Sequence, residues 1–174
     1  MIKIFTLLYI FIGVVSIEKT MAQTPVGLRF EKYCNQPANF CVDFPKDILF
    51  QRHKSPTGVT FKNKDETAWL TCFTWRNWDS SKQRELSVKE QYDYELSHFT
   101  KNNSVVVDNK KLSTNYYVIS GHYYISYPGK QTQALFYYKV IVKQHAFCEA
   151  VLQFPQSQQK EFSEISQRVF ESFH

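Results

Sequence analysis

Between residues 105 and 154 the chain consists almost entirely of strand-like segments, with one helical segment before them and one after them. The strand-like segments, rich in β-branched and aromatic residues, are residues 105–107, 116–120, 123–127, 134–143 and 145–154. The predicted turns between them are Asp108-Asn109, Pro128-Gly129 and Lys143-Gln144. Consecutive strands that are not separated by helices favour an antiparallel sheet.

Three further strands are predicted in the first half of the chain. Residues 40–44 alternate apolar and polar side chains, which is the pattern of a half-buried strand, and this strand ends at Pro45. Residues 59–61 and 68–75 follow, with a polar turn at residues 63–66 between them.

Two amphipathic helices are predicted. Ser87 and Glu90 have the spacing of a capping box, and the first helix then continues to about Phe99. The second helix spans residues 157–173. The apolar stripes are Val88, Tyr92, Leu96 and Phe99 in the first helix, and Phe162, Ile165, Val169 and Phe173 in the second. The order of elements predicts one α+β domain, an antiparallel β-sheet with helices packed on it.

The first 22 residues have the layout of a secretory signal peptide. Met1-Ile2-Lys3 is a short positive segment, residues 4–17 are largely apolar, and Thr20-Met21-Ala22 offers small residues at a cleavage site. An uncleaved anchor is the alternative, but the apolar run falls short of the roughly 20 residues needed to span a bilayer. We therefore expect a mature domain of residues 23–174 that is periplasmic or secreted, without stable membrane insertion.

The four cysteines predict disulfides, because an even number of cysteines in an exported chain usually forms bridges. Four cysteines allow three pairings, and the sequence alone does not choose among them. The turn at Pro37-Ala38-Asn39 favours Cys34–Cys41, which leaves Cys72 to pair with Cys148. The close spacings typical of zinc sites and of redox motifs are absent.

The sequence contains no recognisable catalytic or cofactor-binding motif. None of the five histidines lies in an H-x-x-x-H or H-E-x-x-H pattern, and no nucleophile elbow, Walker or Rossmann pattern is present. The 21 Lys and Arg residues are scattered, which indicates a solvated surface and argues against nucleic-acid binding. No catalytic residue, cofactor or metal site is therefore predicted.

Two residue pairs that could suggest catalysis are predicted not to meet. His145 and Cys148 lie three apart on a strand, so their side chains should point to opposite faces. Asp93 and Glu95 lie two apart on the first helix and should diverge, although paired carboxylates can serve glycoside chemistry.

The most informative polar segment is TWRNWDSSKQRE, residues 74–85. Trp75, Arg76 and Trp78 are candidates for a partner-binding patch, because Trp and Arg are enriched at binding hot spots. The alternative is that Trp75 continues the core face of its strand and Trp78 folds back over it as a lid. The tyrosine pairs at residues 116–117, 123–124 and 137–138 should place one ring on each face of the sheet.

Two stretches of the chain resemble PsbP-like domains. They are YCNQPANFCVDFP at residues 33–45 and FYYKVIVKQHAFCEAVLQFPQSQQKEFSEISQRVFESF at residues 136–173. The resemblance covers residues 30–173 and extends to exported bacterial members of unknown function and to DcrB-type relatives. It implies an α/β/α sandwich, usually a non-enzymatic binding role, and no universal cofactor. The functional residues of no branch can be transferred, and fold analogy alone does not establish function.

Taken together, these patterns predict an exported, non-enzymatic binding or accessory protein that binds another protein of the envelope or exterior. An immunity or inhibitor protein is a narrower alternative. A small-molecule-binding protein, or a hydrolase with a site assembled from scattered residues, would require a pocket.

Overall fold

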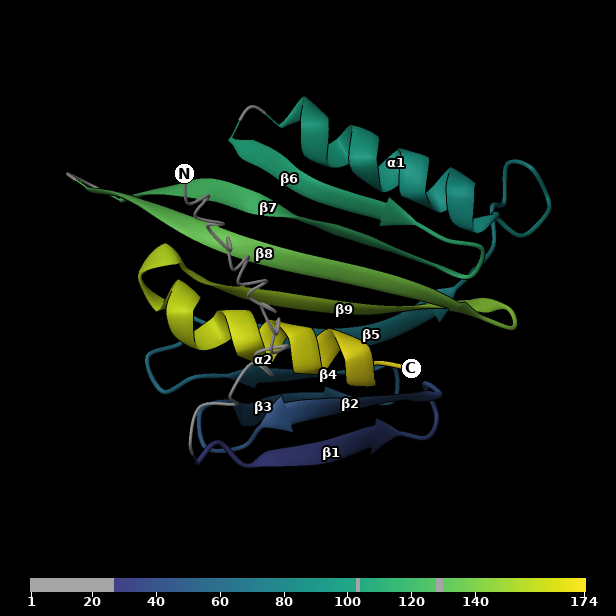
Figure 1. Cartoon of the computed structure of the whole chain (residues 1–174). Coiled ribbons are helices and arrows are strands. Elements are labelled where there is room, and N and C mark those ends of the chain that lie inside the picture. The colour runs from purple at the N-terminus through teal and green to yellow at the C-terminus, as the bar shows by residue number, and fades with distance from the viewer. Residues whose placement is uncertain (1–26, 103, 128–129) are drawn as a thin grey trace, which may run out of the picture.

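The computed structural model describes residues 27–174 except residues 103, 128 and 129 (Figure 1). The described residues form nine strands: β1 (Phe30–Asn35), β2 (Phe40–Pro45), β3 (Phe50–Ser55), β4 (Gly58–Lys62), β5 (Trp69–Arg76), β6 (Val105–Leu112), β7 (Tyr116–Tyr127), β8 (Lys130–Lys143) and β9 (Ala146–Pro155). The helices are α1 (Val88–Lys101) and α2 (Gln159–Ser172), and a short 3₁₀ turn (Gln156–Gln158) precedes α2. The predicted signal peptide, residues 1–22, lies outside the described residues.

Seven of the strands form one antiparallel sheet in the order β3-β4-β5-β9-β8-β7-β6, and β1 and β2 form a separate hairpin. Strand β9 pairs with β5 on one side and with β8 on the other, so the last strand joins the two halves of the chain. In Figure 1 the hairpin and α2 lie on one side of the sheet, and α1 lies beyond β6 and β7.

The two helices cover opposite faces of the sheet, as adjacent tyrosines of β8 demonstrate. Tyr137 contacts Phe170 of α2, with ring centroids 6.1 Å apart. Tyr138 points the other way and contacts Phe99 of α1 at 5.6 Å. Because successive side chains of a strand point to opposite faces, α1 and α2 lie on different sides of the sheet. The fold is therefore an α+β antiparallel sheet with a helix packed on each face, as predicted.

Each helix packs the apolar stripe that the sequence predicted against a core, and the stripe is fully buried in α2 and partly buried in α1. The residues of the α2 stripe, which are at most 1% exposed, are Phe162, Ile165, Val169 and Phe173. They pack with the inward side chains of β2, Phe40, Val42 and Phe44. The α1 stripe is Val88, Tyr92, Leu96 and Phe99, and it packs on a second core that includes Tyr117, Ile119 and Phe136.

The strands differ from the prediction in several places. β1 and β3 were not predicted, and residues 116–127 form one strand instead of two. Asp108-Asn109 is not a turn, because the pairing of β6 with β7 shifts register at this point and then continues to Leu112. Such a shift is a β-bulge, which bends a strand without ending it. The predicted turn at Lys143-Gln144 is present, with Gln144 at a φ of 48°, whereas residues 128 and 129 lie outside the described residues.

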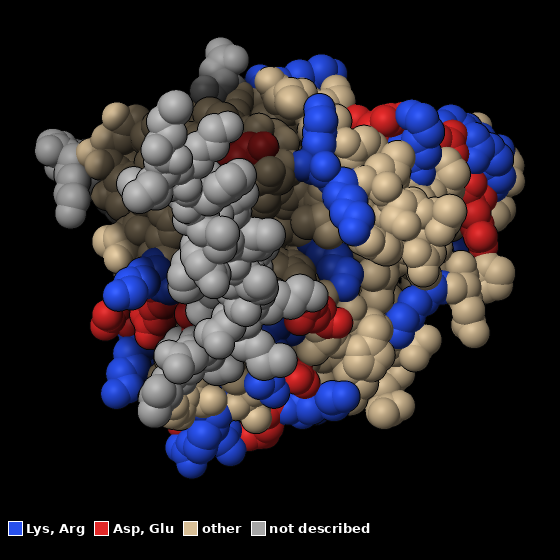
Figure 2. Space-filling model, in the orientation of Figure 1, with Lys and Arg blue, Asp and Glu red and all other residues tan. Residues whose placement is uncertain are grey.

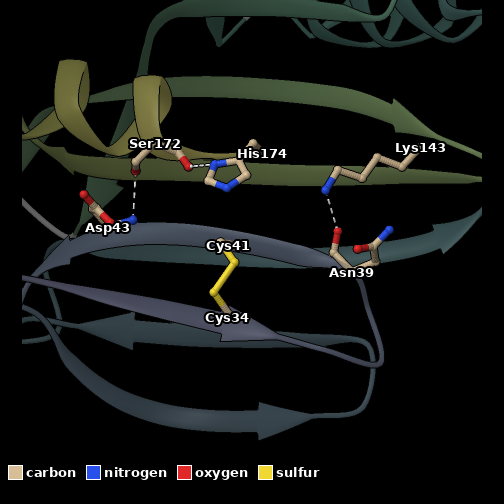
Figure 3. The surroundings of a disulfide bond; sticks show 7 residues. All are labelled: Cys34, Asn39, Cys41, Asp43, Lys143, Ser172 and His174. Carbon is tan, nitrogen blue, oxygen red and sulfur yellow. Dashed lines mark hydrogen bonds between the residues drawn. A yellow bond between two sulfur atoms is a disulfide. The ribbon is translucent and has the colours of Figure 1, made fainter.

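Cys34 and Cys41 form a disulfide across the β1–β2 hairpin, where they are direct cross-strand partners with Cα atoms 4.1 Å apart (Figure 3). The predicted Cys72–Cys148 bridge is wrong, since both residues are free, buried thiols. In the pairing of β5 with β9, Cys72 lies opposite Ala150 and Cys148 lies opposite Thr74. The two thiols are therefore two positions out of register, and diagonal neighbours are too far apart for disulfide geometry.

Within the described ranges, no helix is long and apolar enough to cross a membrane.

Candidate functional site

The loop between β5 and α1 is closed by a buried asparagine. Asn77 is 3% exposed, its Nδ2 donates to the carbonyl of Leu86, and its Oδ1 accepts from the Leu86 N–H, both at 2.9 Å. The Asn77 side chain thus satisfies both the N–H and the carbonyl of Leu86, as a neighbouring strand would. The loop between Asn77 and Leu86 is held as a closed unit at the start of α1.

Charged side chains tie the same loop to α1. Asp79 and Arg84 form an isolated β-bridge, and the Glu90 carboxylate pairs with Arg84 at 2.5 Å and with Lys82 at 3.1 Å. Glu90 also completes the predicted capping box with Ser87. The hydrogen bond from Arg84, together with those from Ser87 and Lys82, lowers the pKa of Glu90 far below its usual range. Acidic and basic side chains accordingly lie next to each other at this end of α1 (Figure 2).

The structure separates the three predicted patch residues into two groups. Trp75 is partly buried on the sheet, and its ring centroid lies 5.2 Å from that of Phe73 and 5.6 Å from that of Phe147. Trp78 is 41% exposed, and the Arg76 guanidinium lies over its ring at 5.1 Å. Trp75 thus belongs to the margin of the core, whereas Arg76 and Trp78 belong to the surface.

Sequence reasoning missed the most exposed aromatic residue of this region, Tyr94 of α1, which is 66% exposed. It borders a shallow pocket of about 270 Å³ whose lining residues are Asp79, Lys82, Leu86, Glu90, Gln91 and Tyr94. The available signal was its place on the helix, since Tyr94 lies outside the buried stripe and yet is aromatic. We call Arg76, Trp78, Tyr94 and the residues that line this pocket the α1 patch.

A second, larger pocket of about 470 Å³ lies beside the disulfide. Its lining residues are Cys34, Asn35, Gln36, Pro37, Lys54, Ser55 and Pro56. The buried polar group here is already satisfied, because the Asn35 amide donates to the Ser55 carbonyl and accepts from the Ala38 N–H, both at 3.2 Å. No large exposed aromatic side chain lines this pocket, so the α1 patch is the stronger candidate for recognition.

The residue pairs that could suggest catalysis do not meet, as expected. His145 pairs with Glu85, whereas the Cys148 thiol accepts a hydrogen bond from Thr74 Oγ1 at 3.3 Å inside the core. Asp93 pairs with Lys89 on the surface, whereas Glu95 accepts from Gln91 Nε2 at the margin of the core. Over the described part of the chain, no three His, Cys, Asp or Glu residues are grouped so that they could hold a metal ion.

A hydrogen-bonded histidine–aspartate pair lies at the β-bulge of β6. His122 Nδ1 is 2.9 Å from Asp108 Oδ2, and the His122 ring meets Tyr124 edge to face. The bulge turns Asp108 toward β7, which is a common effect of bulges. No serine or cysteine side chain is hydrogen-bonded to this histidine among the described contacts, so the pair does not form a nucleophile–base arrangement.

These features define a class of protein: an α+β domain with an antiparallel sheet, a helix on each face, and an aromatic patch on its surface. No known protein family and no curated protein matches the sequence. Solved structures, however, share the fold.

The Ran-binding protein Mog1p of Saccharomyces cerevisiae is similar over 84% of this chain and 95% of its own, with 9% identity and a TM-score of 0.57. PsbP (CyanoP) of Synechocystis sp. PCC 6803 matches 83% of this chain and 91% of its own, with 10% identity and a TM-score of 0.55. LpqN of Mycobacterium tuberculosis is described as involved in cell envelope biogenesis. It matches 84% of this chain and 90% of its own, with 12% identity and a TM-score of 0.50. The protein therefore has the PsbP/Mog1-like fold. At these identities the likeness concerns the fold alone.

Proposed function

We propose that this protein is an exported, non-enzymatic binding protein that recognises a protein partner through the α1 patch. The observation that carries the proposal is the presentation of Trp78. Its ring is 41% exposed, yet it lies under the Arg76 guanidinium on a loop that Asn77 closes. An exposed aromatic side chain on a rigid loop loses little conformational entropy on binding, which favours a hot spot.

Two further observations support a protein partner. Tyr94 adds a second exposed aromatic ring next to a pocket, and the acidic and basic groups around it largely neutralise one another. Exposed Trp, Tyr and Arg side chains are enriched at protein interfaces, and a surface without an excess of positive charge is poorly suited to an anionic polymer. Among proteins with this fold, Mog1p is described as Ran-binding, which is consistent with partner binding on such a scaffold.

Export is part of the proposal. The Cys34–Cys41 disulfide is of the kind that persists in oxidising compartments, and residues 1–22 have the pattern of a signal peptide. LpqN, which shares the fold, is described as involved in cell envelope biogenesis. We therefore place the partner in the envelope or outside the cell.

The test is capture of the partner with the tagged protein, produced with its own leader, from the envelope and secreted fractions of its host. The captured partner is then purified, and its affinity is measured for the wild type and for W78A, R76A and Y94A. We expect W78A to weaken binding at least about tenfold, since hot-spot truncations cost about 2 kcal/mol or more. Y124A is the matched control, because Tyr124 is 43% exposed on β7, away from the α1 patch.

Equal affinities for the wild type, W78A and Y94A would overturn the choice of surface. If only a small molecule copurifies, the proposal of a protein partner fails, and the pocket beside the disulfide becomes the site to test. In that case substitution of Lys54, which lines the larger pocket, should reduce retention of the molecule.

A further inference from the structure

A carboxyl group of α1 and a carboxyl group of the sheet beneath it lie close enough to interact electrostatically. Glu149 of β9 is 7% exposed, and Tyr138 Oη donates a hydrogen bond to its Oε2 at 2.7 Å. Glu95 of α1 is partly buried and accepts from Gln91 Nε2 at 2.9 Å. Neither carboxyl takes part in any ion pair between the residues that the structure describes.

The other elements around Glu149 supply hydroxyls and apolar groups. Strand β8 contributes Tyr138, and β7 contributes the buried Tyr117. Strand β5 contributes its cross-strand partner, Phe73. Helix α1 contributes Glu95, and the exposed basic group that acts on Glu95 is His98, one turn further along the helix.

Ionisation of Glu149 in this position is costly. A buried carboxylate without a cation must be hydrated or pair with a donor, and the Tyr138 hydroxyl can donate only one hydrogen bond. Burial, together with the facing Glu95 carboxyl, raises the pKa of Glu149 to about 8, although the Tyr138 hydrogen bond acts in the opposite direction. Burial likewise raises the pKa of Glu95. The carboxyls are therefore tolerated while at least one of them is protonated.

We propose that this carboxyl pair is a pH-sensitive latch on α1: the helix remains docked while Glu149 is protonated, and it opens as Glu149 ionises. The inference rests on the proposed function, because α1 carries Glu90, Gln91 and Tyr94 of the α1 patch, and Leu86 lies just before it. Opening of α1 would therefore dismantle the patch. Binding of the partner would be favoured at acidic and neutral pH and weakened at alkaline pH.

The direction follows from proton linkage. A carboxyl whose pKa is raised in the folded state contributes its full stability below the pKa of the open state, near 4.5. That contribution declines as the pH rises and is lost once the pH exceeds about 8. Protection of α1 should therefore be greatest near pH 5 and lowest near pH 9.

The test is amide hydrogen exchange of the full domain between pH 5.5 and 8.5, with rates corrected for intrinsic exchange. For peptides within residues 88–101, we expect protection to fall at least about tenfold over this range. The reason is that opening of α1 releases up to one proton from Glu149, so opening becomes easier as the pH rises. Peptides within residues 159–172 of α2 serve as the internal reference and should not show this fall. Constant protection of α1 across the range would overturn the latch.

The variant E149Q sharpens the test, because its amide has no charge to gain and its oxygen can still accept from Tyr138. We expect the fall in α1 protection to disappear in E149Q and to remain in the control E164Q, which alters an exposed carboxyl of α2. A fall in E149Q equal to that of the wild type would overturn the proposal. If E149Q does not fold, E95Q replaces it, and its fall should be smaller and end at a lower pH, because the carboxyl that helps to raise the pKa of Glu149 is gone; a profile identical to the wild type would contradict the role of the pair.

Hydrogen exchange needs no partner, so the two proposals can fail separately. If α1 opens with pH but W78A binds the partner as well as the wild type, the latch stands and the proposed binding surface falls. If W78A abolishes binding but α1 protection is constant, the binding surface stands and the latch falls.

Discussion

Lys139 of β8 extends its ammonium group to the C-terminal end of α2. Its ammonium donates to the carbonyl of Phe170 at 2.5 Å and to that of Phe173 at 3.1 Å. Carbonyls in the last turn of a helix have no partner within the helix and carry partial negative charge. Burial lowers the pKa of Lys139, and interactions with Tyr116 and Glu171 act in the opposite direction. The lysine thus fixes the C-terminal end of α2 against β8.

Replacement of Lys139 by methionine should destabilise the protein by about 1–2 kcal/mol, because the apolar stem is retained while the bonds to two partly buried carbonyls are lost. The measurement is urea-induced unfolding followed by circular dichroism. K160M is the control, since Lys160 is exposed on α2, and it should change stability by less than about 0.5 kcal/mol. Equal losses in the two variants would show that Lys139 acts only through general surface charge.

The cysteines show what residue-level reasoning could and could not predict. Cys34 and Cys41 flank a short turn, so their proximity follows from local sequence. Whether Cys72 and Cys148 meet depends on the register between β5 and β9, two strands that lie far apart in the sequence. A shift of two positions separates the thiols, and no local pattern specifies that shift.

At the scale of elements, the β5–α1 loop is ordered by side-chain hydrogen bonds. Asn77 binds both polar groups of Leu86, and Asp79 Oδ1 accepts from the backbone N–H of Ser81 at 2.9 Å. A loop without strands or helices must satisfy its backbone groups in this way or expose them to water. Asn77 therefore helps to hold the loop that carries Trp78.

Replacement of Asn77 by alanine should destabilise the protein by about 2 kcal/mol, because both groups of Leu86 lose their partner in a partly buried place. We also expect faster proteolysis within residues 78–86 and weaker partner binding, although Trp78 itself is unchanged. S80A, an exposed change in the same loop, is the control for both measurements. A loop as resistant in N77A as in S80A would show that the ion pairs of Glu90 alone hold it.

Helices and strands were predicted well where a periodic pattern of apolar residues was accompanied by a capping or turn signal. The capping box at Ser87 and Glu90 located α1, and the apolar stripe gave its buried face. Strand β3 was missed because four of its six residues are polar and exposed, so no alternation marks it. Residues 108–109 suggested a turn by their composition, whereas tertiary pairing with β7 converts them into a bulge.

At the scale of the whole molecule, the β1–β2 hairpin is integrated into the fold through its contact with the C-terminal helix. The backbone of Cys41 exchanges two hydrogen bonds with His174, at 2.8 and 3.2 Å. The Asp43 N–H donates to Ser172 Oγ at 2.8 Å, and Lys143 reaches the Asn39 carbonyl (Figure 3). The hairpin, α2 and the central strands share one core. The sequence indicated the disulfide and the buried face of α2, but it gave no sign that the two lie side by side, since this contact joins the two ends of the described chain.

This arrangement predicts that the disulfide stabilises the whole domain and not the hairpin alone. Loss of a bridge that closes so short a loop should cost about 2.5 kcal/mol by the chain-entropy estimate. In C34A/C41A we expect the urea midpoints from far-ultraviolet and near-ultraviolet circular dichroism to fall together, because α2 cannot keep its packing once the hairpin detaches. Wild-type protein with the disulfide reduced should give the same curves. A hairpin that unfolds in a separate, earlier transition, with the midpoint of α2 unchanged, would show that the shared core is held by α2 and the seven-stranded sheet without the hairpin.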